Sequence, residues 1–408
     1  MQNEYQELEI SPAEDLIDES SATEQTSRFS QVVFFLLCVI LIFSTLAYGA
    51  VETWAFGFIS IFIGLIAVFW LADAWFGKEL RFSTSLLQIP LLGLILVGLI
   101  QLLPLRSADV SNGLLTVPAV NSLSINAYAT RIAIVQLIIY AVFFTAAFVF
   151  INSPQRLRKI VAMVVIFGAL MAFFGILQRL ENPDGIYGWR PTPQAIPFAS
   201  FVNQHHFAAF MEMTIGLTLA LLVGKATDKD KRLLLIIAIV LMGIAILLTG
   251  SRGGLLSLFG VLGFVFLTTF LRKEKNGEEV SKDDKRAKLR RNFALIGGGL
   301  ALIVVLFGSV LLLGGDASLV RGVGFTNQAD ASSGRTHFWW VALQIFENYP
   351  LFGAGLDAFG TAFPHYDTWN GNLRVEQAHN DYLQILADAG ILGFLCIASF
   401  VFLLLKKG

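Results

Sequence analysis

Ten apolar runs dominate this sequence, and each approaches the ~20 residues that a helix needs to cross a bilayer. Only 14% of the 408 residues are charged, whereas a soluble domain carries about 25%. Lipid offers the backbone no hydrogen-bond partner, so each run is expected to be helical. The sequence therefore predicts an all-α, polytopic transmembrane helical bundle of about ten spans. The runs lie at about 30–48, 55–72, 84–103, 131–151, 159–178, 206–224, 233–249, 254–271, 293–313 and 382–405.

Residues 1–29 differ from the rest of the chain because they are polar and acidic. They lack the basic start and short apolar core of a cleaved signal peptide. We expect them to form a disordered tail on the cytoplasmic side, ahead of a single membrane domain at 30–408.

The basic residues predict the orientation of the spans. With the N-terminus inside, the cytoplasmic segments and adjoining span ends hold 21 of the 29 basic residues, including all twelve lysines. Two explanations fit an outer face that carries only arginine. One is the ordinary inside bias of positive charge, and the other is phosphate recognition by the guanidinium fork. The eight outer arginines are Arg106, Arg131, Arg179, Arg190, Arg252, Arg321, Arg335 and Arg374.

Two outer loops are long, at 179–205 and 314–381, and loops of the second length are usually functional. In the second loop, Ser332 or Ser333 can cap a helix that starts near Arg335 and stops before Pro350. Arg335 then lies beside the free N–H groups of a first helical turn, which is a suitable place for a phosphate. The alternative is an ordinary surface arginine.

Three more polar groups lie near the outer ends of spans. Arg252 follows a Gly-Ser step between two apolar runs, and is either a phosphate ligand or a snorkelling side chain. Glu212 lies ~9 Å deeper in its span than His206, where an ionisable group is a functional candidate with arginine as its expected partner. Asn203 and the neighbouring histidines either bind a polar ligand or cap the helix.

The segment AHNDYLQILADAGILG places His379, Asn380 and Asp381 at the outer mouth of the last span. Asn380 and Asp381 suit a helix cap. His379 is not needed for capping, and its imidazole can accept a proton at neutral pH. The two cysteines, Cys38 and Cys396, lie inside apolar runs and are expected to be buried thiols. The outer carboxylates are scattered, so neither a metal site nor a cofactor is expected.

Several segments resemble, in order and spacing, the bacterial O-antigen ligase and polymerase family: LTGSRGG, SGRTHFWW with NYPLFGAG, AHNDYLQILADAGILG, FVNQHHFA and, more faintly, AYGAVETWAFG. The resemblance covers most of the chain after about residue 40. It implies a glycosyltransferase of the bacterial inner membrane that acts without a metal on the periplasmic face. The implied donor is a glycan linked to undecaprenyl diphosphate, the acceptor is a saccharide or lipid A–core, and no nucleic acid is involved.

The resemblance also implies roles for individual residues. His379 matches the histidine that acts on the acceptor hydroxyl, while Arg252 and Arg335 match arginines that hold the diphosphate. Trp339 matches a tryptophan four residues after the second arginine. Arg321 matches no position and ranks lower as a supporting residue, together with Glu212, Asn203 and Asn380. Outer aromatic residues can stack on sugars: Tyr187, Trp189, Tyr366 and Trp369.

Family members often have one or two further helices after the histidine segment. This sequence ends at FVFLLLKKG, so it is expected to be either a shorter member or a fragment. The shared motifs leave ligase and polymerase activity open, and a protein O-glycosyltransferase is a weaker alternative. A transporter or flippase of lipid-linked saccharides would be expected to place paired charges near the midplane and to show repeated halves. Here the candidates gather at one surface.

Overall fold

The computed structural model describes residues 27–106, 121–181, 185–192, 195–224, 226–274, 334–369 and 374–407. Three predicted features lie outside the described residues: the tail before residue 27, the run at 293–313, and Arg321.

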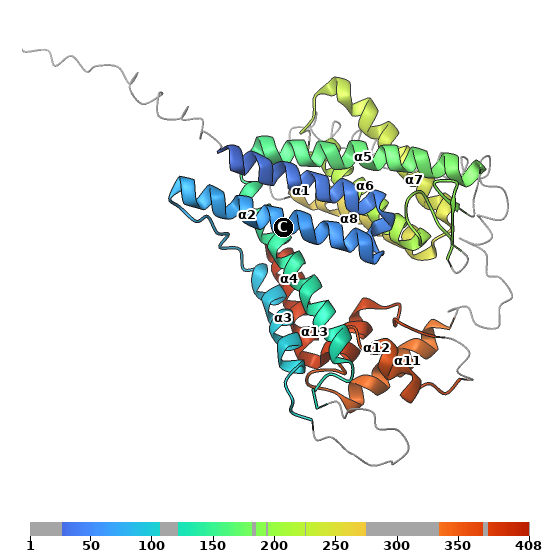
Figure 1. Cartoon of the computed structure of the whole chain (residues 1–408). Coiled ribbons are helices and arrows are strands. Elements are labelled where there is room, and N and C mark those ends of the chain that lie inside the picture. The colour runs from blue at the N-terminus through green and yellow to red at the C-terminus, as the bar shows by residue number, and fades with distance from the viewer. Residues whose placement is uncertain are drawn as a thin grey trace, which may run out of the picture.

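Helices make up nearly all the regular structure of the described residues (Figure 1). Nine of the ten predicted runs coincide with a helix, so the expected all-α, polytopic helical bundle is confirmed. The α-helices are α1 (Arg28–Leu46), α2 (Thr53–Gly77), α3 (Gln88–Gln101), α4 (Ala127–Phe150), α5 (Pro154–Glu181), α6 (Gln204–Val223), α7 (Arg232–Thr249), α8 (Arg252–Glu274), α11 (Arg335–Asn348), α12 (Phe359–Ala362) and α13 (Asp381–Lys407). The 3-10 turns are η2 (Tyr48–Ala50), η3 (Lys229–Lys231) and η4 (Phe363–His365), and strands β1 (Gly185–Ile186) and β2 (Arg190–Pro191) form a small hairpin.

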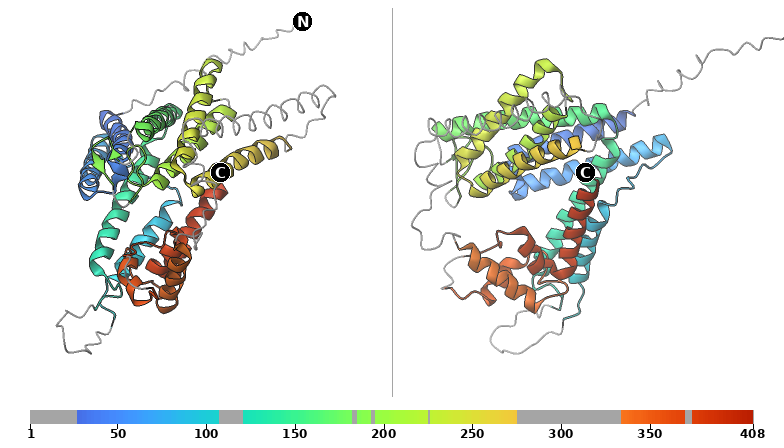
Figure 2. Two further views of the ribbon diagram at one scale, coloured as in Figure 1. Left: turned by 90° about the vertical axis from the view of Figure 1, so that its right-hand side faces the viewer. Right: turned by 180° about the vertical axis from the view of Figure 1, so that it is seen from behind.

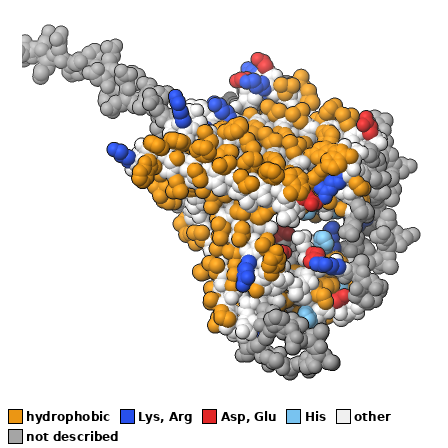
Figure 3. All heavy atoms as spheres, viewed as in Figure 1, with side chains coloured by type: hydrophobic (Ala, Val, Ile, Leu, Met, Phe, Trp, Pro, Cys, Tyr) orange, Lys and Arg blue, Asp and Glu red, His pale blue; other side chains and the backbone are white. Residues whose placement is uncertain are grey.

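Seven described helices are long and apolar enough to cross a membrane: α1, α2, α4, α5, α6, α7 with its preceding turn, and α13. The apolar stretches of α3 and α8 are shorter, so the number of about ten spans stays a prediction. Only 17% to 56% of the most apolar stretch of each span is buried, and apolar side chains cover much of the face that Figure 3 shows. A surface of this kind is stable when lipid covers it.

The helices form two groups, which Figures 1 and 2 show from three sides. In the first group α6 packs on α5, α7 and α8, and α1 packs on α2. In the second group α3 packs on α4 and α13, and α11 packs on α13. Helix α4 joins the groups because it also contacts α1 and α2.

Small residues let the helices of the first group approach closely, as is common in membrane bundles. Gly168 on α5 faces Thr214 on α6, and a Cβ added to this glycine would lie 2.6 Å from the threonine side chain. Gly254 on α8 faces Ala208 on α6 in the same way, at 2.8 Å. The beginnings of α6 and α8 are therefore held side by side.

A glycine kink shapes the second group. Gly390 interrupts α13 with φ 63° and ψ −161°, and a Cβ there would lie 2.5 Å from the carbonyl oxygen of Leu351. The segment PLFGAG, residues 350–355, fits against this kink, where Ile391 N donates to Pro350 O at 2.9 Å and Ala354 N donates to Ala387 O at 2.8 Å. The turn that follows α11 is thus fixed on α13.

Gln101 secures the same turn from α3. Its side-chain amide donates to the carbonyl oxygens of Phe352 (2.5 Å) and Asp388 (2.8 Å), and its oxygen accepts from Leu356 N at 2.9 Å. Gln101 is fully buried, so it satisfies backbone groups that would otherwise be unpaired.

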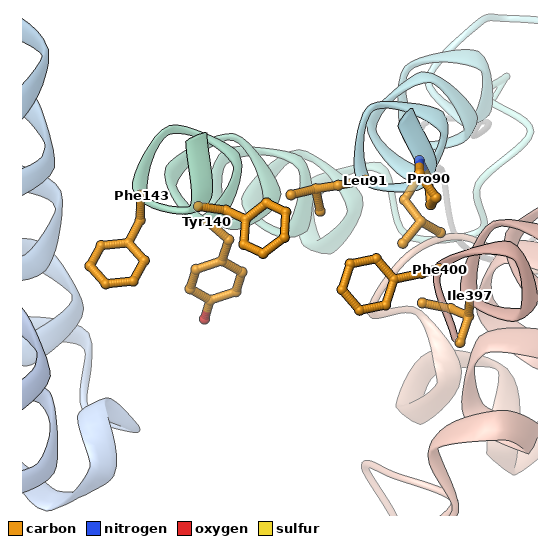
Figure 4. Close-up of a pocket in the computed structure, with 8 residues that line it drawn as sticks. Pro90, Leu91, Tyr140, Phe143, Ile397 and Phe400 are labelled. Carbon is orange, nitrogen blue, oxygen red and sulfur yellow. The ribbon is translucent and has the colours of Figure 1, made fainter. Parts of the chain in front are cut away.

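An apolar pocket of about 380 Å³ opens between α3, α4 and α13 (Figure 4). Ile397 and Phe400 line it, and the first of these lies roughly 24 Å along the helical rise from Asp381. The pocket is therefore far from the polar end of α13. Its lining residues are Pro90, Leu91, Leu94, Tyr140, Phe143, Phe144, Ile397 and Phe400.

Candidate functional site

The main candidate residues share one structural position, because each lies at or just before the start of a helix. Asn203 caps α6, Arg252 opens α8, Arg335 opens α11, and His379 lies two residues before α13. The first turn of a helix has unpaired N–H groups and the positive end of the helix dipole. Helix starts therefore favour an anionic ligand wherever they meet.

At the start of α6, the open question about Asn203 has a structural answer. Its side-chain oxygen accepts a hydrogen bond from His205 N at 2.8 Å, so Asn203 caps the helix. His205 and His206 follow in the first turn, and both side chains are exposed.

Helix α8 is joined to α6 through His205. The ring Nδ1 of His205 hydrogen-bonds the hydroxyl of Ser251 at 2.8 Å. The same Ser251 oxygen accepts from Gly254 N at 3.1 Å and so caps α8. Arg252 follows Ser251 directly, with an exposed side chain. The position of Arg252 is thus tied to the histidine pair of α6.

Glu212 lies two turns further along α6 and is half-buried. Its carboxylate interacts with the hydroxyl of Ser257 on α8. Within the described residues its partner is this serine, while the arginine partner expected from the sequence stays a prediction. The close approach at Gly254 turns this face of α8 toward α6.

The helix predicted after Ser333 is α11, which begins at Arg335 and ends before Pro350. Its cap residue Gly334 has φ 84°, while the predicted caps Ser332 and Ser333 lie outside the described residues. Arg335 is exposed in the first turn. Trp339 is half-buried, and its indole nitrogen has no hydrogen-bond partner within the described part of the chain.

At the start of α13, Asn380 is the cap that the sequence predicted. Its side-chain oxygen accepts from Tyr382 N (3.1 Å) and Leu383 N (3.3 Å). His379 has a left-handed backbone with φ 52°, which costs about 1–2 kcal/mol in a residue other than glycine. The neighbouring Ala378 is fully buried, and its N–H donates to the side chain of Gln384 at 2.7 Å. The contacts of the neighbouring Ala378 thus hold this strained segment in place.

Electrostatic interactions show that these helix starts converge. Partial burial lowers the pKa of His379 below its usual value, and the charge of Arg335 and then of His206 lowers it further. The imidazole of His205 interacts with both Arg335 and His379. The rings of Phe338 on α11 and His379 lie 6.0 Å apart, so α11 begins near His379, and the start of α6 lies within electrostatic range of it. Helix α8 is tied to α6 through the contact of Ser251 with His205. Figure 3 shows a hollow here between the two groups, with basic, acidic and histidine side chains at its edge.

A pocket of about 310 Å³ adjoins His379. The ring of Phe338 lies 6.0 Å from the imidazole, and Arg374 forms an ion pair with Glu376 at the same pocket. The sequence analysis had not singled out Phe338, Gln377 or Glu376. The pocket is lined by Phe338, Arg374, Val375, Glu376, Gln377 and His379.

The aromatic candidates for sugar stacking differ in exposure. Trp189 is 70% exposed and Trp369 is 44% exposed. Trp369, however, lies flat against the ring of His337, with centroids 4.2 Å apart. Tyr187 donates its hydroxyl to Leu46 O at 2.5 Å, which gives it a structural contact.

Among the described residues, no group of three histidine, cysteine or carboxylate side chains could hold a metal ion. Cys38 and Cys396 are both unpaired and partly buried thiols.

Comparison with known proteins addresses the resemblance seen in the motifs. Residues 237–398 match the family model described as O-antigen ligase. The matched segment contains Arg252, Arg335, Trp339 and His379, while Asn203 and Glu212 precede it. No curated protein matches the chain. The family model confirms the resemblance to the O-antigen ligases and polymerases over residues 237–398.

Proposed function

We propose that this protein transfers a glycan from an undecaprenyl-diphosphate-linked donor to a sugar hydroxyl, on the periplasmic face of a bacterial inner membrane. The observation that carries the proposal is the meeting of His379 with Arg335 and His206, which come from three helix starts far apart in the sequence. The O-antigen ligase domain supports a glycosyltransferase-like enzyme at the level of the family.

His379 is suited to act as the general base. Its lowered pKa keeps the imidazole neutral at pH 7, so a ring nitrogen can accept the proton of the acceptor hydroxyl. The adjoining pocket of about 310 Å³ has room for the acceptor sugar. General-base catalysis of this kind contributes about 10²–10⁴-fold to a rate.

The arginines are suited to the leaving group. As the new bond to the acceptor oxygen forms, the bond from the anomeric carbon to the diphosphate breaks, and the electron pair leaves with the diphosphate. Arg335 and Arg252 each stand at a helix start, where guanidinium and backbone N–H groups together stabilise the growing negative charge. Attack from the face opposite the diphosphate inverts the anomeric centre. In this proposal the arginines take the role that a divalent metal has in other glycosyltransferases.

The positive-inside distribution of lysine supports the periplasmic placement of this site. Transfer to lipid A–core corresponds to a ligase, and transfer to a second lipid-linked repeat corresponds to a polymerase. Both acceptors present a sugar hydroxyl to the same base, so both belong in the test.

The test is transfer by purified protein in liposomes, with an undecaprenyl-diphosphate oligosaccharide as donor, each acceptor in turn, and EDTA present. Wild type is compared with His379→Ala, Arg335→Lys and the control His365→Ala, which changes an exposed histidine of η4. We expect transfer in EDTA for wild type and the control, and a loss of at least about 10²-fold for the other two. Full activity of His379→Ala would reject His379 as the general base, whereas no transfer by wild type would favour a transporter of lipid-linked saccharides.

A further inference from the structure

A cluster that the proposed chemistry does not use lies next to Arg335. His337 is two residues further along the first turn of α11, and its Nε2 lies 2.7 Å from Oδ1 of Asp367. The same carboxylate oxygen accepts the backbone N–H of Trp369 at 2.9 Å. Asp367 and Trp369 belong to the segment after η4, so this segment is fastened onto the beginning of α11.

The indole of Trp369 completes the fastening. Its ring is parallel to the imidazole of His337, with an interplanar angle of 8° and centroids 4.2 Å apart. It also covers Gly334, where an added Cβ would lie 3.1 Å from the indole. The side chains of His337 and Asp367 are only 11% and 10% exposed, so water competes little for their hydrogen bond.

The contacts of this cluster flank Arg335, which the proposed reaction uses. Arg335 lies between Gly334 and His337 in the chain, so contacts on both sides of it fix the path of its backbone. Its own side chain remains exposed, and its charge acts on His379. Phe338, the next residue, contacts both Trp369 and His379, with ring centroids 6.0 Å apart in each pair. The cluster and the candidate site thus share one helical turn.

The charge of Asp367 suits this arrangement. The backbone N–H of Trp369 and the side chain of His337 lower the pKa of Asp367, so the carboxylate stays ionised at neutral pH. This fixed negative charge holds the imidazole of His337 in place.

We propose that His337, Asp367 and Trp369 are positioning residues, which fix the first turn of α11 so that Arg335 faces His379 and the diphosphate of the donor. This inference rests on the proposed function, since it assigns Arg335 to the donor. A displacement of about 1 Å at a reacting centre can lower a rate by roughly 10²-fold. The cluster therefore influences transfer without touching the substrate.

The variants separate the two contacts. Asp367→Asn weakens the hydrogen bond to His337, and Trp369→Ala removes the stack, while Trp369→Phe keeps an aromatic ring in its place. The matched control is Trp340→Ala. Trp340 lies on α11 and is as exposed as Trp369, but its ring lies 6.1 Å from that of His337, compared with 4.2 Å for Trp369. We expect kcat to fall about 10–10²-fold in the first two variants. The KM for the acceptor should change little, and Trp369→Phe and the control should stay near wild type.

The pH profile distinguishes positioning from general stability. When Arg335 moves away from His379, the acid limb of kcat against pH should move to higher pH in Asp367→Asn and Trp369→Ala. These variants could instead yield less folded protein while the folded fraction keeps the wild-type kcat and acid limb. That result would overturn the proposal and leave the cluster a structural role only. Unchanged kinetics in all variants would overturn it as well.

Hydrogen exchange separates this inference from the proposed function. The amides of His337 and Phe338 donate to Gly334 O at 3.1 and 3.2 Å, so their protection reports on the first turn of α11 without any substrate. Loss of this protection in Asp367→Asn supports the fastening even if wild type shows no glycan transfer. Equal protection in wild type and variant would show that the cluster does not hold the turn.

Discussion

His205 and Ser251, which belong to different helices, share a hydrogen bond of 2.8 Å between Nδ1 and the hydroxyl. The contact brings the histidine pair at the start of α6 to the cap of α8, directly before Arg252. Through His206 and Arg335, the same region reaches His379. Four helix starts therefore contribute to one polar region in an otherwise apolar molecule.

Breaking this hydrogen bond should loosen Arg252 without removing it. We expect Ser251→Ala to cost about 1 kcal/mol of stability, because His205 and Gly254 N both lose their partner. Transfer should fall less than in Arg252→Ala, in which the guanidinium itself is absent. Thermal unfolding in detergent and transfer kinetics would measure the two effects.

A double-mutant cycle with His205→Ala isolates the pair. The two substitutions should couple by about 0.5–1.5 kcal/mol, whereas His206→Ala, one residue further on, should be additive with Ser251→Ala. Additive effects for both histidines would mean that the contact does not stabilise the start of α8.

The pH dependence of transfer follows from His379. Because partial burial and then the charges of Arg335 and His206 lower its pKa, the neutral base persists below the ordinary histidine value of about 6.5. The acid limb of kcat/KM should therefore lie below pH 6.5. Measuring kcat/KM from pH 5 to 8 with a saturating donor checks this expectation.

Substituting Arg335 should reverse part of the lowering of the His379 pKa. Arg335→Gln should move the acid limb of the residual activity to higher pH, since one of the groups that disfavour imidazolium is gone. His206→Gln should move it in the same direction by less, because His206 contributes less than Arg335 to the lowered pKa. An acid limb that stays in place in Arg335→Gln would show that the two side chains are apart in solution.

The helical bundle was predictable because a backbone in lipid must satisfy its own hydrogen bonds, which few structures other than helices can do. Apolar runs of about 20 residues indicate spans directly, and caps such as Asn380 have a local signature. The kink at Gly390 was not predicted, because it depends on the carbonyl of Leu351 packing from a distant segment. The residues around Gly390 alone do not predict that contact.

The candidate site was predictable only in its list of residues. Motifs and helix starts indicate His379, Arg335 and Arg252, and in the structure the charge of Arg335 acts on His379. The roles of His205, His337 and Asp367 depend on pairings across 30 to 46 residues. The contact of Glu212 with Ser257 was not predicted, because rotation of α8 about its axis cannot be read from the sequence.

Glu212 offers a test of charge against hydrogen bonding. Glu212→Gln keeps an oxygen that can accept from Ser257 but removes the charge. We expect its transfer rate to stay within about threefold of wild type, as the structure links Glu212 to the α6–α8 contact. Glu212→Ala should lower the unfolding temperature. A loss of transfer in Glu212→Gln comparable to that of His379→Ala would place the carboxylate in the reaction itself.

The kink in α13 makes a sharper prediction about stability. At Gly390 the backbone is left-handed, and a Cβ would lie 2.5 Å from Leu351 O. Because that oxygen belongs to fixed backbone, Gly390→Ala combines strain with overpacking and should cost at least about 2 kcal/mol. The control is Gly64→Ala in α2, where nothing lies within 4 Å of an added Cβ. Unfolding of both variants in one detergent should separate them by several degrees, and equal stability would mean that α13 runs straight through this position.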